Sequence, residues 1–220
     1  MSSFRRDAVV ALTSGGLDSL VLVRTLLDGG AHVWPVYVRC GVRWEAVELA
    51  WLRRWLAALA SRRLRPLSRL AFPVRQLYGS HWSLSGRRVP SAVSPDTAVY
   101  LPGRNMLLVG AAAMYAAQRG ISRVALGTLK GNPFGDATPA FFRRYAQVLR
   151  QALGRPMRIE APLRRLTKAQ LIAAHPTAAY QRTFSCIAPV GWHHCGRCNK
   201  CAERRRAFRQ AGVIDPTPYA

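Results

Sequence analysis

The sequence predicts an α/β fold, a doubly wound parallel sheet with a cysteine-rich segment at the C-terminal end. Two observations carry this prediction. Short apolar runs alternate with longer stretches of helical periodicity as far as residue 174, and strands that alternate with helices form parallel sheets covered on both faces. Four of the five cysteines then gather between Cys186 and Cys201. We expect one domain at residues 1–180 and a metal-binding segment at residues 181–220 packed on it.

The first expected strand is Ala8–Leu12, five apolar residues without a polar interruption. Such a run is typical of a strand buried on both faces. Helix Ser19–Leu27 follows it. Strand Val33–Val38 then precedes a long helix at about Trp44–Ala60, where apolar residues recur at helical spacing. A third strand is expected near Ser68–Phe72.

Residues Val74–Gly103 show no clear periodicity and are rich in Ser, Gly and Pro. This stretch is too long for a plain connection in a compact domain, which predicts a substrate loop or lid. The later expected elements are helix Arg104–Arg119, strand Arg123–Leu126, helix Ala140–Leu153, a strand around Met157–Ala161 and helix Lys168–Ala174, with Thr167 as its cap and Pro176 beyond its end.

Length and composition indicate a globular protein. The chain has 220 residues, half of them hydrophobic, which suffices for a full core. No apolar run approaches the length of a membrane span. The apolar run that follows Met1–Arg6 is too short for a signal-peptide core, so we expect a cytoplasmic protein without a membrane partner.

The net charge of +23 predicts affinity for anions such as ATP, carboxylates or nucleic acid. Arginine supplies 30 of the 33 basic residues, and lysine only three. The arginine pairs are spread along the chain and are not interleaved with aromatic residues as in a stacking surface. A nucleic-acid partner and a solvated basic surface therefore both stay open.

Between the first strand and the first helix stands the hexapeptide Ser14-Gly15-Gly16-Leu17-Asp18-Ser19. We expect its glycines to allow positive φ and a close approach of the backbone to a ligand. Amide groups at a helix N-terminus suit an anion such as pyrophosphate. Ser14 and Ser19 add hydroxyl groups, and Asp18 is suited to hold Mg²⁺. The alternative is an ordinary strand–helix turn in which Asp18 or Ser19 caps the helix.

Cys186, Cys195, Cys198 and Cys201 have the spacing of a closed tetrahedral Zn²⁺ site. His193 or His194 is an alternative ligand, and an iron–sulfur cluster or a redox Cys-x-x-Cys pair are alternative chemistries. We expect zinc with a structural role, because a closed four-cysteine site leaves no open position for a substrate.

The hexapeptide resembles the pyrophosphate loop of the N-type ATP pyrophosphatases. That resemblance implies an adenine nucleotide alpha hydrolase-like fold, binding of ATP by residues 14–19 and cleavage between the α- and β-phosphates. Together with the cysteine cluster and Pro102-Gly103-Arg104-Asn105, it makes the chain resemble the 7-cyano-7-deazaguanine synthase family of the queuosine pathway. Further matching segments are Tyr37-x-x-Cys40-Gly41, Gly127, Glu160-x-Pro162-Leu163 with Lys168, Ser185-Cys186, and Ala211-Gly212-Val213-x-Asp215-Pro216-Thr217.

This resemblance implies an ATP-dependent ligase. ATP adenylylates the carboxylate of 7-carboxy-7-deazaguanine, ammonia displaces AMP to give the amide, and a second ATP converts the amide to the nitrile. The residues it assigns are Asp18, Arg104 and Lys168 to catalysis, Gly103, Asn105, Phe134 and Asp136 to the substrate, and the four cysteines to zinc. The alternatives are a surface arginine for Arg104, a solvated lysine for Lys168 and a plain turn for Phe134 and Asp136. The resemblance also implies a homodimer.

The departures from the family pattern fall around the substrate. Ala137 and Thr138 stand where the family has Cys and Arg, Val42-Arg43-Trp44 replaces Gln-x-His, and Arg182 stands where an acid often precedes the first zinc cysteine. The alternative functions are a divergent relative that transfers the activated deazaguanine to an amine of a protein or nucleic acid, a tRNA-modifying ATPase of the same superfamily, or a non-catalytic binding module.

Overall fold

The structure, a computed structural model, describes residues 7–220, so the first six residues of the predicted domain lie outside it. Five strands form one parallel sheet in the order β3-β2-β1-β4-β5. The strands are β1 (Ala8–Leu12), β2 (His32–Arg39), β3 (Ser68–Ala71), β4 (Arg123–Ala125) and β5 (Arg158–Glu160). The predicted doubly wound parallel sheet is confirmed.

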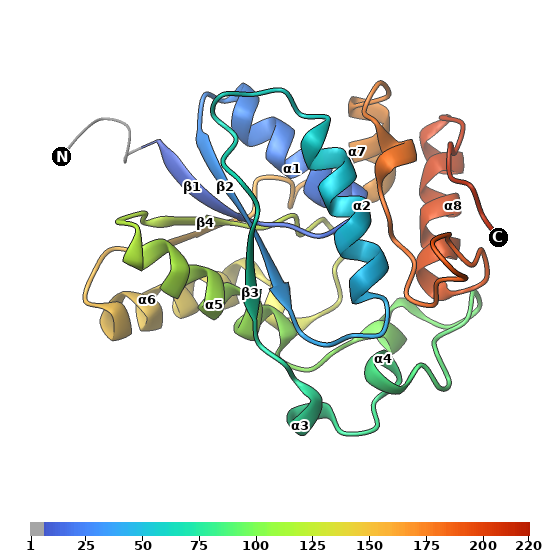
Figure 1. The fold of residues 1–220 in the computed structure, drawn as a ribbon, viewed down its shortest axis with the longest axis horizontal. Helices are drawn as coiled ribbons and strands as arrows, with labels where there is room; N and C mark the ends of the chain where they lie inside the picture. Colours follow the sequence, from blue (N-terminus) through green and yellow to red (C-terminus); the bar gives the residue numbers. More distant parts are fainter. Residues whose placement is uncertain (1–6) are drawn as a thin grey trace.

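Helices cover both faces of the sheet (Figure 1). One face carries α1 (Leu17–Asp28), α2 (Glu45–Ala57), α7 (Lys168–Ala174) and α8 (Asn199–Ala211), and the other carries α5 (Arg104–Gln118) and α6 (Pro139–Leu153). All predicted helices are present within a few residues of the expected bounds. Thr167 caps α7 in a capping box with Gln170, as its sequence predicts.

The apolar composition of β1 follows from its central position. Ala8 and Val10 pack toward α5, whereas Val9 and Ala11 pack toward α1. All four side chains are buried. A strand in this position has no solvated face, so alternation of polar and apolar residues is absent.

Residues 74–103 are mostly irregular, as predicted, with two four-residue helices, α3 (Arg75–Tyr78) and α4 (Trp82–Ser85), and a short 3₁₀ turn at Asp96–Val99. This segment contacts the cysteine-rich segment through backbone hydrogen bonds. Ala92 N–H donates to the carbonyl of Arg197, and Asn199 N–H donates to that of Pro90. The two segments therefore support one another.

Helix α8 is the long element that the sequence interpretation missed. Its Arg204 is fully buried and donates to Thr217 Oγ1 (2.6 Å), Thr183 Oγ1 (2.9 Å) and the carbonyl of Tyr180 (2.9 Å). These bonds tie the C-terminal tail and the Tyr180 turn to the helix. Within residues 7–220, no helix has the length and apolar character needed to cross a bilayer.

Candidate active site

A cleft of about 430 Å³ lies at the carboxyl ends of the strands. It opens where β1 and β4 are neighbours and the strand order reverses, the usual ligand position in such sheets. Its walls come from the ends of β1 and β2, the segment after β4, and the first turns of α5, α7 and α8.

The hexapeptide loop leads from β1 into α1 and forms one end of this cleft. Gly16 precedes α1, and no side chain caps the helix, so its first amide groups are available to an anion. Ser14 and Ser19 are linked to each other: Ser14 N–H donates to Ser19 Oγ (3.0 Å), and the two hydroxyls lie 3.1 Å apart. Leu17 is buried in the core and contributes backbone alone.

The prediction of positive φ in this loop is wrong. Gly16 has a φ of −71°, and Gly15 is not among the positive-φ glycines. Gly15 is required for steric reasons instead, because a Cβ at this position would overlap the backbone of α2. The expected alternative, a helix cap by Asp18 or Ser19, is also absent, since Asp18 and Ser19 lie within the first turn of α1.

Asp18 lies in the cleft with one carboxylate oxygen free. Its Oδ1 atom is buried and has no hydrogen-bond partner among the described residues, and the same holds for Thr128 Oγ1. Burial raises the pKa of Asp18, and Lys168 acts in the opposite direction. A buried oxygen atom without a partner fits a hard cation such as Mg²⁺.

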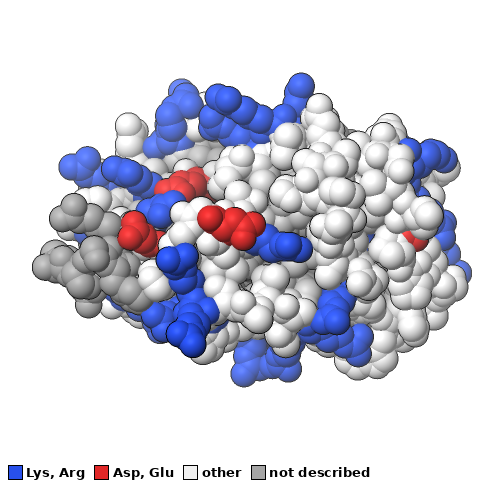
Figure 2. Space-filling model, turned by 90° about the horizontal axis from the view of Figure 1, so that it is seen from above, with Lys and Arg blue, Asp and Glu red and all other residues white. Residues whose placement is uncertain are grey.

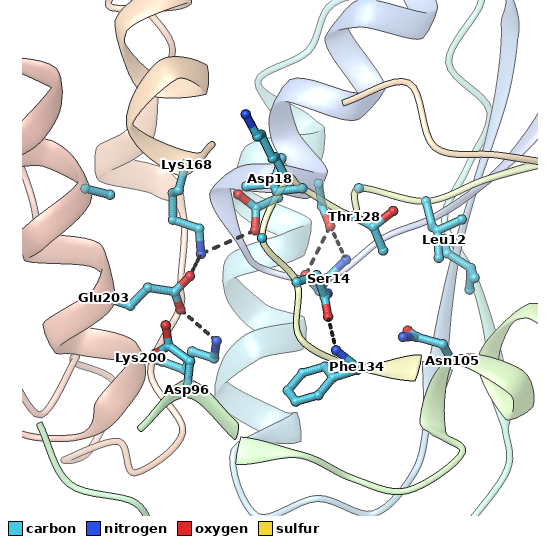
Figure 3. A pocket seen from close by; sticks show the side chains of 18 of the residues that line it. Leu12, Ser14, Asp18, Asp96, Asn105, Thr128, Phe134, Lys168, Lys200 and Glu203 are labelled. Carbon is cyan, nitrogen blue, oxygen red and sulfur yellow. Dashed lines mark hydrogen bonds and ion pairs between the residues drawn. The ribbon is translucent and has the colours of Figure 1, made fainter. Parts of the chain in front are cut away.

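Lys168 and two residues of α8 form an ionic cluster opposite Asp18 (Figure 3). Lys168 Nζ lies 2.6 Å from Glu203 Oε1 and 3.5 Å from Asp18 Oδ2. Lys200 Nζ lies 2.7 Å from Glu203 Oε2. Burial acts to lower the pKa of Lys168, but Asp18 and Glu203 more than offset it, so that the pKa lies above its ordinary value. Lys168 is therefore held in its charged form.

A second polar group lines the cleft between β2 and α5. Tyr37 OH donates to Glu48 Oε2 over 2.8 Å, and burial raises the pKa of both side chains. Arg104 opens α5 and faces the same cleft, and its Nε atom has no hydrogen-bond partner within residues 7–220. The first residue of α5 is thus directed inward and is not a plain surface arginine.

The predicted substrate residues are brought together beside Arg104. Phe134 lines the cleft and stacks on Tyr100, with ring centroids 4.8 Å apart. Asp136 is buried, and its two carboxylate oxygens accept from the backbone N–H (2.9 Å) and the side-chain amide (3.2 Å) of Asn105. Asp136 therefore caps the N-terminus of α5, although it lies 31 residues away from Asn105 in the sequence. Gly103 precedes the helix with a φ of +70°.

The four cysteines of the C-terminal segment form one buried cluster. The sulfur atoms of Cys186, Cys195, Cys198 and Cys201 all lie within 4.8 Å of one another. Backbone N–H groups donate to the sulfurs of Cys186 and Cys195. His194 accepts from Ser185 N–H through Nε2, so that ring nitrogen is occupied. Four converging thiol groups fit a tetrahedral metal site, and zinc suits this donor set.

Basic side chains are distributed over the face seen in Figure 2 and do not form a single patch, with acidic side chains between them. The high net charge therefore comes from many scattered arginines. On this face the distribution is typical of a solvated basic surface.

Comparison with known proteins decides the family. The sequence pattern of the family described as queuosine biosynthesis protein QueC matches residues 8–212. The chain belongs to the QueC family. A QueC-family relative, the 7-cyano-7-deazaguanine synthase of Anaeromyxobacter dehalogenans, is 35% identical over 100% of this chain and 98% of its own length. That of Methanothrix thermoacetophila is 32% identical over 96% of this chain and 97% of its own length.

A solved structure with a similar fold is a predicted tRNA methyltransferase subunit from Methanocaldococcus jannaschii. The TM-score is 0.50 at 15% identity, and the match covers 77% of this chain and 74% of that one. This similarity concerns the fold alone. The full-length QueC-family relatives favour the synthase interpretation over the transferase and tRNA-modifying alternatives.

The sequence interpretation did not assign to the site several residues that line the cleft, namely Tyr37, Glu48, Thr128, Lys200 and Glu203. Two signals in the sequence bear on Lys200 and its helix, and none points to the others. Gly212 ends an uninterrupted stretch that has no Gly or Pro from residue 199, which indicates a helix directly after the cysteines. Lysine is also rare in this chain, and all three lysines line the cleft.

Proposed function

We propose that this protein is an ATP-dependent ligase that converts 7-carboxy-7-deazaguanine and ammonia to 7-cyano-7-deazaguanine. The observation that carries the proposal is the cleft at the sheet reversal, which joins an uncapped helix N-terminus to Asp18 and Lys168. The names of the full-length relatives in the family supply the product, 7-cyano-7-deazaguanine, and the resemblance described above implies the substrate.

The chemistry proceeds in two activations. The substrate carboxylate attacks the α-phosphorus of ATP, and pyrophosphate leaves. Ammonia then attacks the acyl carbon, and AMP departs to give the amide. The amide oxygen attacks a second ATP, pyrophosphate leaves again, and loss of AMP and a proton gives the nitrile.

Each part of the cleft has a role in these steps. The amide groups at the start of α1 and the hydroxyls of Ser14 and Ser19 hold the β- and γ-phosphates. Lys168 stabilises the charge that develops on pyrophosphate. Arg104 binds the substrate carboxylate or a phosphate through its guanidinium group.

The deazaguanine ring is assigned to the wall formed by Phe134 and Asn105. The phenyl ring already lies in a stacked pair with Tyr100 at the cleft, which provides an aromatic surface for a planar base. Asp136 then acts on the base through Asn105, whose position it fixes with two hydrogen bonds.

Two ions belong to this proposal. Mg²⁺, held by Asp18, neutralises phosphate charge when it is bound. Zn²⁺, held by Cys186, Cys195, Cys198 and Cys201, stabilises the start of α8 and takes no part in the reaction. A cytoplasmic homodimer is the expected form of the enzyme.

Mass spectrometry of the products tests the proposal. The protein is incubated with Mg²⁺, ATP, ammonia and 7-carboxy-7-deazaguanine, and the expected products are the nitrile, AMP and pyrophosphate. Asp18→Asn, which removes the charge and keeps the shape, is expected to stop AMP release while melting as the wild type does. An amide as the sole product, or no product from folded protein, would move the assignment to the transferase alternative.

A further inference from the structure

The lysines of this chain have an unusual location. Only three of the 33 basic residues are lysine, yet Lys130, Lys168 and Lys200 all line the cleft. A lysine ammonium is a compact point charge on a flexible stem, whereas arginine has a planar, directional group. All three lysines of an arginine-rich chain thus place movable charges in the cleft where the phosphates of ATP are assigned, beside Arg104.

The hexapeptide loop supplies no cation of its own, since residues 14–19 contain neither lysine nor arginine. The nearest ammonium group to Asp18 is that of Lys168, which Thr167 and the capping box hold at the first position of α7. Lys200 comes from the first turn of α8. Two helices that are separate in sequence therefore direct one ammonium each toward the phosphate site.

Glu203 joins these two ammonium groups. One of its carboxylate oxygens accepts from Lys168 (2.6 Å) and the other from Lys200 (2.7 Å). Lys168 lies nearer to Glu203 than to Asp18, which is 3.5 Å away. Figure 3 shows the resulting row of four charged side chains, with Glu203 between the lysines and Asp18 at one end.

This row creates a competition for Lys168. Asp18 needs a free carboxylate oxygen to hold Mg²⁺, and an ammonium placed directly on it would neutralise the charge that attracts the ion. Without the carboxylate of Glu203, the nearest negative partner of Lys168 is Asp18. We propose that Glu203 is a positioning residue that draws Lys168 away from Asp18, leaves Asp18 free for Mg²⁺, and holds Lys200 beside the phosphates.

The inference rests on the proposed function, since it concerns the ATP site of the ligase. Its test is the gain in ATP affinity that Mg²⁺ produces, measured by titration calorimetry without deazaguanine. Wild-type protein and Glu203→Gln are each titrated with ATP, once in saturating Mg²⁺ and once without added divalent metal. In Glu203→Gln, the Mg²⁺-dependent gain is expected to fall about tenfold. ATP affinity without Mg²⁺ is expected to stay the same or rise, because one negative charge is gone.

A merely structural role for Glu203 would weaken ATP binding under both conditions, so the ratio separates the two roles. Glu160→Gln is the matched control, because it removes one carboxylate from a similarly exposed ion pair, that with Arg123 (2.7 Å), and is expected to keep the gain. The double variant Lys168→Gln, Glu203→Gln is expected to regain Mg²⁺ dependence, because the ammonium of Lys168, which lies nearest to Asp18, is no longer present to cover it.

An unchanged Mg²⁺-dependent gain in Glu203→Gln, or no recovery in the double variant, would overturn the inference. If Glu203→Gln does not fold, Glu203→Asp takes its place. In Glu203→Asp the Mg²⁺-dependent gain is then expected to fall less than tenfold, because the shorter side chain still carries a carboxylate, and an unchanged gain would again overturn the inference.

Wild-type protein that binds no ATP would overturn the proposed function together with this inference. Wild-type protein that binds Mg-ATP beside a variant with unchanged gain would overturn this inference alone.

Discussion

Gly15 lies directly against the backbone of Glu48, and a Cβ built on Gly15 would stand 2.8 Å from the carbonyl oxygen of Glu48. That separation is shorter than van der Waals contact allows, and the obstacle is helix backbone that cannot turn aside. The same glycine accepts a hydrogen bond from Phe184 N–H over 2.7 Å. The hexapeptide loop is therefore fixed between α2 and the segment that leads to the cysteine cluster.

Gly15→Ala is accordingly expected to displace the loop. ATP affinity, measured by calorimetry, should fall at least tenfold, because the amide groups at the start of α1 lose their common direction. Gly135→Ala is the control, since a Cβ there meets no atom within 4 Å. A Gly15→Ala variant with wild-type ATP affinity would show that this close approach does not shape the phosphate site.

Arg204 is expected to matter for stability more than any exposed arginine. Arg204→Met keeps the length of the side chain but leaves Asp215 and the carbonyl of Tyr180 without their buried partner. We expect a loss of about 3 kcal/mol, or a decrease of about 6–12 °C in Tm. Arg209→Met, at an exposed position of the same helix, should change Tm little. Equal melting of the two variants would contradict this role.

Cys198→Ser is expected to remove the bound metal and to lower Tm sharply, because metal binding contributes to folding free energy. It should also weaken ATP binding, since α8 begins at the next residue and carries Lys200 and Glu203 into the cleft. Metal content by mass spectrometry and ATP affinity by calorimetry are the measurements. Cys40→Ser, a buried cysteine outside the cluster, should keep its zinc. Retention of zinc and Tm by Cys198→Ser would refute the structural metal site.

The buried carboxyl of Glu48 predicts a pH dependence of stability. Burial raises its pKa above the ordinary value of 4.5, so its contribution to stability is full below that pH and is lost as the pH rises through the raised pKa. Glu48→Gln keeps an acceptor for Tyr37 and carries no charge. Its free energy of unfolding relative to wild type should increase as the pH rises above 4.5. Parallel stability curves for the two proteins would contradict the raised pKa.

The sequence predicts the fold well where burial determines the pattern. Strand β1 matches its expected bounds because both of its faces are covered and every residue must be apolar. The same reasoning does not predict helix α8, because its buried face includes Arg204, Asn199 and Cys201. These residues interrupt the apolar periodicity.

From the residues alone, the site is predictable only where its residues adjoin in sequence, whereas Arg104, Phe134 and Lys168 are assigned through the family resemblance. The loop and the cysteine cluster are local motifs, and both are visible in the sequence. Glu48 and Glu203 reach the cleft from other helices, and pairing between distant charges leaves no periodic signal. Asp136 is predicted as a substrate residue, but its two hydrogen bonds with Asn105 are not predictable, because they depend on a contact across 31 residues of chain.

The fate of the substrate oxygen atoms tests the central claim most directly. 7-Carboxy-7-deazaguanine labelled with oxygen-18 in both carboxylate positions is incubated with Mg²⁺, ATP, ammonia and the protein, and the AMP is examined by mass spectrometry. Adenylylation at both stages predicts that each AMP carries one oxygen-18 atom and that two labelled AMP molecules form for each nitrile. Unlabelled AMP, or ADP and phosphate in place of AMP, would contradict the account.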